Sequence, residues 1–292
     1  MPRRSAPVAF VLTFLGWTLS TGCQDDRARE SLDPEAPIVV DAAGVRHQFT
    51  RPARRIISLV PSATMTIKAI GAGQALVGRT DFDTDAWVAD RPSVGGGLGP
   101  NLEAIVALDP DLVIRFAGGQ DPRTAARLDE LGIPHLAVRP DAVEDIYEMT
   151  GIIGQATGRE SAADSLVQSL STGLSELARA VADWPRLQVA YVLGGSPPWV
   201  TGPGTYIDEV ITLVGGDNVF GDLDALYSAV SPEEFHRRDI DVVLVSERGN
   251  FDESLTPDAR VEEIGGALDL PGPGIVEAAR NLARKIHGRP LQ

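Results

Sequence analysis

Apolar and polar residues alternate with a helical period through one long stretch in the middle of the chain. Between Arg159 and Trp184 there is no proline, and apolar residues recur every three or four positions, at Ala163, Leu166, Val167, Leu170, Leu174, Leu177, Ala178 and Val181. This spacing puts them on one stripe of an α-helix. At about 1.5 Å per residue the helix would be about 36 Å long, more than most helices in a compact domain. We therefore predict one long helix over residues 159–184, closed by Pro185.

The segments on either side of this predicted helix resemble each other. Residues 101–114 and 231–245 align without a gap, matching Asn101 with Ser231, Glu103 with Glu233, Asp109 with Asp239 and Asp111 with Asp241. Each segment has the pattern of an N-cap residue, a short helix with a carboxylate in its first turn, a tight turn and a buried strand. The repeat implies two related lobes that bracket the helix. The alternative is a chance likeness between two common helix–turn–strand units.

Strands and helices alternate in both halves of the chain. We expect strands at 38–41, 45–49, 55–60, 76–78, 112–116, 134–138, 188–193, 218–220 and 242–245. We expect further helices at 63–70, 123–131, 143–157, 205–214, 233–238 and 275–287. The alternation predicts an α/β fold with two lobes, 38–158 and 185–292, whose parallel sheets are flanked by helices. The single long backbone α-helix at 159–184 would join them.

The net charge limits the classes of partner. The chain has 26 lysine and arginine residues against 41 aspartate and glutamate residues, a formal charge of −15 at pH 7. Nucleic-acid phosphates would repel such a chain, and no basic stripe offsets the repulsion. We therefore expect no nucleic-acid partner.

The first residues have the pattern of an export signal. Arg3 and Arg4 precede an apolar segment, 6–19, that is too short to span a bilayer comfortably. Small residues then lead to Cys23, the only cysteine, so an intrachain disulfide is impossible. We expect a signal peptide at 1–22 and a polar, flexible tether at 23–37.

No combination of residues predicts catalysis. The chain lacks the Gly-x-Ser-x-Gly pattern of a nucleophilic serine and the glycine-rich phosphate loop that ends in Lys-Ser or Lys-Thr. The glycines at Gly71 and Gly73 follow a helix, which favours a helix C-cap over a dinucleotide site. The histidines are scattered without metal-ligand spacing, at His47, His135, His236 and His287. We expect no enzyme activity, no catalytic residue, no metal site and no cofactor.

Aromatic residues beside glycines stand near the expected ends of strands. The candidates are Phe82, Phe116 with Gly118, Trp199 and Tyr227. Ligands of open parallel sheets bind at the C-terminal strand ends, and flat rings give large contact area at small entropic cost. We expect Phe116 and Trp199 to follow the ends of matching strands and to face one cleft. The alternative is that these rings only cover the lobe cores.

Glu103 and Glu233 form a second pair of candidates. A carboxylate in the first turn of a helix is favoured by the helix dipole, and this local role alone accounts for both. Two such carboxylates on related lobes could also seat a symmetric partner that carries arginines.

Four stretches of this chain resemble the periplasmic substrate-binding proteins of cobalamin, haem and ferric-siderophore uptake systems. These stretches are Arg55–Thr64, Asn101–Ile114, Thr201–Phe220 and Pro271–Arg284. The resemblance covers nearly the whole chain after the tether. It implies two α/β lobes joined by a rigid helix, with the ligand between them, and delivery of that ligand to a membrane permease with its ATPase. A sole cysteine after an export signal is similar to the lipobox of bacterial lipoproteins, which are acylated on that cysteine, although Ser20 replaces the usual aliphatic residue.

The resemblance also assigns roles to single residues. Glu103 and Glu233 match the lobe-top glutamates that dock on permease arginines, and Phe116 resembles the cleft aromatic that precedes Gly-Gly in cobalamin binders. Two positions depart from the cobalamin pattern: Gly95–Gly97 replace a tryptophan, and Phe82 replaces a tyrosine. In the C-terminal lobe, residues 250–270 look shortened and Gly274 stands where many relatives have arginine.

On this resemblance we expect a monomeric lipoprotein receptor, anchored through Cys23 at the periplasmic or cell surface, that binds a corrinoid or iron chelate. Haem would need an axial ligand such as Tyr206, Tyr227 or His236. A ferric siderophore would be held by arginines, with Arg115 and Arg139 as candidates. An enzyme or a solute sensor on the same fold is the remaining alternative.

Overall fold

The structure is a computed structural model that describes residues 36–118 and 122–291. The expected signal peptide, Cys23 and all but the last two residues of the tether lie outside the described residues. Within the described ranges, no helix is both long and apolar enough to cross a membrane.

A small hairpin leads into the first lobe. Strands β1 (Ile38–Val40) and β2 (Arg46–Gln48) pair antiparallel. Between them the carboxylate of Asp41, whose side chain is fully buried, accepts hydrogen bonds from the backbone N–H groups of Ala43 and Val45 at 2.9 Å each. It also accepts from the N–H of Ala137, in strand β6 (His135–Val138), at 3.0 Å and contacts His47 at 3.0 Å. One buried carboxylate therefore fixes the hairpin to the edge of the first sheet.

The first lobe is built on a four-stranded parallel sheet in the order β4 (Leu76–Gly78), β3 (Ile56–Ser58), β5 (Leu112–Phe116) and β6 (His135–Val138). Successive strand residues point to opposite faces. Ile56 and Ile114 join one core with helices α1 (Pro61–Ala69) and α4 (Val143–Thr157). On the other face, Ile57 and Val113 pack with helices α2 (Leu102–Ala107) and α3 (Pro122–Glu130). The continuous apolar strands are thus explained by burial on both sides.

The second lobe has a mixed sheet centred on β7 (Leu187–Gly194). Strands β11 (Val242–Val245), β12 (Arg260–Glu263) and β9 (Gly216–Asn218) run parallel; β11 was predicted and β9 overlaps the predicted 218–220, whereas β12 was not predicted. Strands β8 (Trp199–Thr201) and β10 (Tyr227–Ala229) are antiparallel additions, which the sequence did not predict. The chain reverses after β7 at Gly194 and Gly195, whose φ angles of +107° and +93° suit glycine. One face carries α6 (Tyr206–Leu213) and α8 (Ile275–His287), and the other carries α7 (Pro232–His236).

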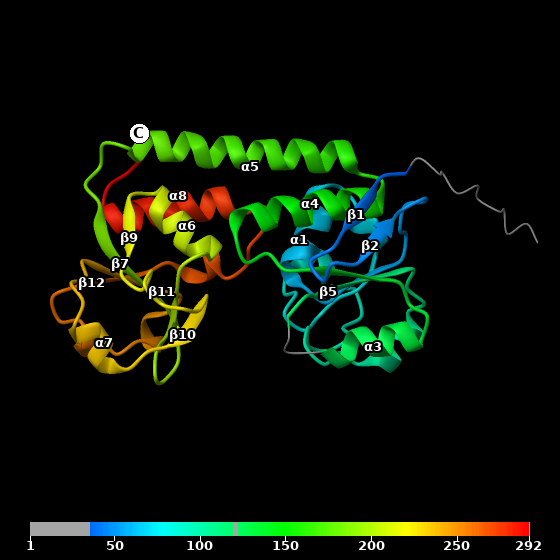
Figure 1. Ribbon diagram of the computed structural model, residues 1–292, viewed down its shortest axis with the longest axis horizontal. Helices are drawn as coiled ribbons and strands as arrows, with labels where there is room; N and C mark the ends of the chain where they lie inside the picture. The colour runs from blue at the N-terminus through cyan, green and yellow to red at the C-terminus, as the bar shows by residue number, and fades with distance from the viewer. Residues whose placement is uncertain (1–35, 119–121, 292) are drawn as a thin grey trace, which may run out of the picture. The chain divides into compact units, whose positions relative to one another are not determined.

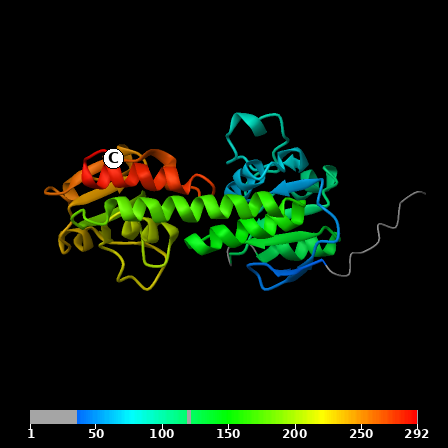
Figure 2. The same cartoon turned by 90° about the horizontal axis from the view of Figure 1, so that it is seen from above.

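Helix α5 (Glu160–Val181) runs unbroken along both lobes, as the apolar stripe predicts (Figure 1, Figure 2). Its first turns pack on the first lobe through Ala163, and its later turns enter the core of the second lobe through Leu170, Leu174, Leu177 and Val181. Gly173 faces α8, where an added Cβ would lie 2.9 Å from Val276. Glycine therefore allows the close approach of α8 to α5.

The start of helix α4 provides a second connection between the lobes. Val143, Ile146 and Tyr147 of α4 belong to the core of the second lobe, beside α5 and α6. The N–H of Val143 donates to the Glu209 carboxylate of α6 at 3.1 Å, and the N–H of Tyr206 donates to the Asp141 carbonyl at 2.6 Å. The lobes are therefore joined by packed helices, an arrangement that favours small relative movements.

The internal repeat has a matching structural role in each lobe. The Asp111 carboxylate accepts from the N–H groups of Arg54 and Arg55 at 2.9 Å each, just before β3. The Asp241 carboxylate accepts from Gln188 at the start of β7 at 2.7 Å. Strand β5 therefore corresponds to β11, and β3 to β7. This corrects one expectation: Phe116 ends β5 whereas Trp199 follows β7, so the two residues do not follow matching strands.

Candidate ligand-binding site

The larger of two candidate hollows lies in the second lobe, and we call it the C-side hollow. It has a volume of about 870 Å³ and includes the C-terminal ends of three parallel strands, through Leu193 of β7, Ser246 and Glu247 after β11, and Glu263 of β12. The rest of its lining is Tyr206, Ile207, Tyr227, Asn250, Gly265, Gly266, Leu268 and Asp269. Ligands of open α/β sheets bind at this edge.

The smaller hollow lies in the first lobe, and we call it the N-side hollow. Its volume is about 180 Å³, and its lining is Pro61, Thr64, Met65, Phe82, Asp83, Thr84, Asp85, Trp87, Val88 and Leu270. Phe82 is 69% exposed, an unusual position for so large an apolar side chain. The Asp83 carboxylate accepts from the N–H and hydroxyl of Thr80, at 2.8 and 2.7 Å, which fixes the loop that carries the ring.

Consecutive residues of one segment line the two hollows, and together we call the hollows the interlobe site. Leu268 and Asp269 line the C-side hollow, and the next residue, Leu270, lines the N-side hollow. The chain then passes the start of α1, where an added Cβ on Gly272 would lie 3.6 Å from the Ser62 carbonyl oxygen. The segment 268–272 therefore crosses from one lobe to the other along the floor of the site.

Two tyrosines of the second lobe, Tyr206 and Tyr227, line the C-side hollow, and a third, Tyr191, is buried beside its lining residues Ser246 and Asp269. Burial, followed by the neighbouring Asp141, raises the pKa of Tyr227 to about 12. Burial also raises the pKa of Tyr206, whose hydroxyl donates to the Leu268 carbonyl, and that of Tyr191 beneath the hollow. All three therefore keep their protons at neutral pH, and Tyr206 donates a hydrogen bond to the Leu268 carbonyl.

The charged groups that line the interlobe site all have the same sign. Glu247, Glu263 and Asp269 line the C-side hollow, and Asp83 and Asp85 the N-side hollow, whereas neither lining includes a lysine, arginine or histidine. No group of three or more His, Cys, Asp or Glu side chains is placed to hold a metal ion in the described part of the chain. The site can therefore hold a ligand by apolar contact, tyrosine hydroxyls and carboxylate acceptors.

Of the aromatic candidates, Phe82 and Tyr227 line the two hollows. Trp199 is 48% exposed on β8, where it pairs with Ala229 of β10. Because side chains alternate along a strand, Trp199 shares the Tyr227 face of this ribbon but lies beyond the hollow. Phe116 is half-buried against the first-lobe core, and an added Cβ on Gly118 would meet its ring at 2.4 Å. Glycine at 118 therefore makes room for the Phe116 ring, and both residues lie outside the two linings.

Three of the residues considered for siderophore or haem binding, Arg115, Arg139 and His236, lie outside both hollows. Arg115 donates to His135 at 3.1 Å, and Arg139 pairs with Asp141 at 2.5 Å. His236 is exposed at the end of α7. None of these three residues belongs to the lining of either hollow.

Most of the C-side lining was missed by sequence reasoning. Ser246, Glu247 and Glu263 follow or end buried parallel strands, so the strand-end rule could have found the first two after 242–245. Asp269 and Leu268 lie in the segment 250–270, which looked shortened. This segment does contain strand β12, paired with β11.

The two candidate docking glutamates lie on equivalent helices. Glu103 is exposed in the first turn of α2, which Asn101 caps by accepting from the Ala104 N–H at 3.1 Å. Glu233 is exposed in the first turn of α7, and a hydrogen bond with the Ser231 side chain holds its pKa below the usual value. Both helices cover the sheet face opposite α5, because α2 and α7 belong to cores that do not include α5.

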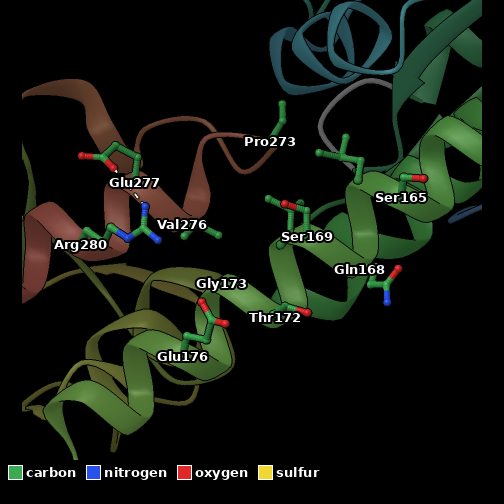
Figure 3. Close-up of a pocket in the computed structure, with 12 residues that line it drawn as sticks. Ser165, Gln168, Ser169, Thr172, Gly173, Glu176, Pro273, Val276, Glu277 and Arg280 are labelled. Atoms are coloured by element: carbon green, nitrogen blue, oxygen red, sulfur yellow. Dashed lines mark ion pairs between the residues drawn. The ribbon is translucent and has the colours of Figure 1, made fainter.

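A third hollow lies between α5 and α8, on a different surface from the strand ends. It has a volume of about 620 Å³ and is lined by α5 residues between Ser165 and Glu176, with Pro273, Val276, Glu277 and Arg280 opposite (Figure 3). Arg280 pairs with Glu277 at 3.7 Å. This groove has no aromatic residue in its lining and results from packing two helices at Gly173.

Comparison with known proteins agrees with this architecture. Residues 56–264 match the periplasmic binding protein family. A cobalamin-binding protein of Halobacterium salinarum is 32% identical over 212 residues, which are 70% of this chain but only 57% of that protein, so the match spans little more than half of that relative.

Two solved structures have the same fold. The periplasmic vitamin B12 binding protein BtuF of Vibrio cholerae superposes with a TM-score of 0.71 and 25% identity, over 80% of this chain and 97% of that one. The periplasmic heme-binding protein RhuT from Roseiflexus superposes with a TM-score of 0.71 and 22% identity, over 81% and 98%. Since the TM-scores are equal, the fold does not decide between these ligands.

Proposed function

The chain belongs to the periplasmic binding protein family, and from this we propose that it is the substrate-binding component of an ABC importer. It would hold a corrinoid or an iron chelate in the interlobe site and deliver it to a permease with its ATPase. The observation that carries this proposal is that the segment 268–270 contributes to hollows of both lobes, and that helix α5 packs on both lobes. We propose a receptor with no covalent chemistry.

The direct test is binding of cyanocobalamin and of ferric chelates to the purified chain, by calorimetry and absorption spectroscopy. We expect one ligand per chain. Failure of every chelate to bind would refute the function.

Phe82 and Tyr227 are proposed as the main aromatic contacts, with Phe116, Gly118 and Trp199 as contacts nearer the rim. Truncating a ring that contacts ligand costs about 1–3 kcal/mol. Phe82→Ala and Tyr227→Ala should each weaken binding about tenfold or more, whereas Leu131→Ala, an exposed apolar control on the first lobe, should not. If the wild type and the three variants bound the ligand equally well, Phe82 and Tyr227 would not be ligand contacts.

Glu103 and Glu233 are proposed to dock on arginines of the permease. Their support is their exposure on equivalent helices of the two lobes. The double change Glu103→Arg and Glu233→Arg should leave chelate affinity unchanged and abolish transport. Normal uptake by that variant would contradict docking through these residues.

We propose that Cys23 carries a lipid that holds the protein at the outer side of a membrane, as a monomer. The support is the basic start, the short apolar segment and the single cysteine. Mass spectrometry of the membrane fraction should detect an acylated N-terminal cysteine, and Cys23→Ser should release the protein. An unmodified Cys23 in membrane-bound protein would refute the anchor.

A further inference from the structure

The carboxylates of the C-side hollow are not balanced by cations. The side chains of Glu247 and Glu263 are exposed and have no ion-pair or hydrogen-bond partner among the described residues. Arg248, which follows Glu247, points elsewhere: it pairs with Glu253 at 3.3 Å and donates to the Val261 carbonyl at 2.7 Å. A ligand bound in the hollow would therefore be exposed to the negative charge of these two side chains.

A second feature indicates that the hollow receives a polar ligand. The Tyr191 side chain is fully buried and does not belong to the lining, and its hydroxyl faces the Ser246 and Asp269 side chains, which do line the hollow. Among the described residues, neither of these side chains makes a hydrogen bond of regular geometry with that hydroxyl, and they bond to each other at 3.1 Å. Ser246 and Asp269 therefore give the hollow a polar wall that suits a ligand with hydrogen-bonding groups.

Resting on the proposed function, we propose that the interlobe site selects metal chelates that carry no net negative charge and present amide N–H donors, and that it rejects anionic chelates. The chemistry is that of a corrinoid ring, with its primary amide side chains, or of a ferric trihydroxamate. Glu247, Glu263 and Asp269 would accept from the amides, and Leu193, Phe82 and Leu270 would contact the apolar faces.

The same residues act against haem. Its two propionates would lie among carboxylates with no lysine or arginine in either lining. Axial ligation by a tyrosine requires a phenolate, and burial, followed by the nearby Asp141, opposes loss of the proton from Tyr227. Tyr206 is almost fully buried, and its hydroxyl is already bound to the Leu268 carbonyl.

The test compares four probes on the full chain by calorimetry: cyanocobalamin, cationic ferrioxamine B, hemin and trianionic ferric enterobactin. We expect the tighter of the first two to bind at least ten times more tightly than either anion at 0.15 M salt. Which of the two is tighter identifies the source of the amide donors. If hemin or ferric enterobactin bound more tightly than the other two probes, the proposed selectivity would be wrong but the receptor function would still hold. If none of the four bound, both the selectivity and the receptor function would be refuted.

A charge-neutral variant tests the residues themselves. The double variant Glu247→Gln with Glu263→Gln keeps the side-chain shape and an acceptor oxygen at each position. Its affinity for cyanocobalamin or ferrioxamine B should therefore change less than about threefold. Hemin should bind roughly tenfold more tightly, since each removed charge contributes roughly threefold at these distances. The matched control is Glu160→Gln with Glu176→Gln, which removes two charges from α5 and should leave every affinity unchanged. An unaltered hemin affinity in the first variant, or an equal gain in the control, would overturn the proposal.

Discussion

Glu209 forms a hydrogen bond that helps to join the two lobes, and substitution can measure how much this bond contributes to stability. Its carboxylate accepts from the N–H of Val143, the first residue of α4, at 3.1 Å, where Ala142 offers no side-chain cap. In Glu209→Ala the half-buried N–H loses its acceptor, which costs about 1–2 kcal/mol. For a chain of this size that lowers Tm by roughly 2–8 °C. Differential scanning calorimetry and urea denaturation measure both quantities.

Glu209→Gln separates the hydrogen bond from the charge. Burial raises the pKa of Glu209, with further contributions from Asp145, Asp208 and Glu144, against the opposing effect of the Val143 hydrogen bond. Glutamine keeps an acceptor oxygen and removes the repulsion, so at pH 7 this variant should be as stable as the wild type or slightly more stable.

The pH dependence of Glu209 has a defined sign. Because the folded protein holds this proton more tightly than the unfolded chain, the contribution of Glu209 is largest below its ordinary pKa. It is lost as the pH rises through the raised folded pKa. From pH 4 to 7 the wild type should therefore lose stability relative to the glutamine variant. Equal destabilisation by alanine and glutamine would refute the reasoning, because it would show that the acceptor oxygen does not stabilise the fold and that removing the charge does not relieve repulsion.

The remaining predictions concern other single contacts. Gly173→Ala places a methyl group 2.9 Å from Val276 and should destabilise the protein by about 1–3 kcal/mol in urea denaturation, whereas the same change at Gly151, where an added Cβ meets nothing within 4 Å, should not. Hydrogen bonds, led by that from Ala137, hold the pKa of Asp41 low against the effect of burial. Its stabilisation should therefore be present above the ordinary pKa and lost as the pH falls through the lowered one. Asp41→Asn should cost about 1–3 kcal/mol at pH 7 and progressively less as the pH falls below the ordinary pKa, and a loss that does not change with pH would contradict this. Tyr206→Phe removes the hydrogen bond to the Leu268 carbonyl and should cost about 1 kcal/mol, with faster amide exchange over 265–270; unchanged exchange would show that this bond does not hold the site floor.

Long periodic segments could be predicted from the sequence. Helices α4 and α8 begin and end at the predicted residues, and α5 is shorter than predicted by one residue at its start and three at its end. Their apolar stripes and their glycine or proline boundaries are local signals. Strands β8, β10 and β12 were missed because each has three or four residues, too few to establish a period, and depends on partners far along the chain.

The site could be predicted only in part, for a related reason. Phe82 and Tyr227 stood out as aromatics in glycine-rich surroundings, a local signal. Tyr191, Ser246 and Asp269 come together only through the strand order β7–β11–β12 and the path of residues 265–270. The pairing of Phe116 with Trp199 was wrong because it matched β5 with β7, although the repeat itself aligns β5 with β11.

Hydrogen-exchange mass spectrometry with and without the tightest chelate tests the central claim most directly. If the ligand occupies the interlobe site, amides in 80–88, 246–250 and 265–270 should be protected together, while the groove of α5 and α8 stays unchanged. Protection confined to one lobe, or centred on residues 165–176 and 273–280, would contradict the account.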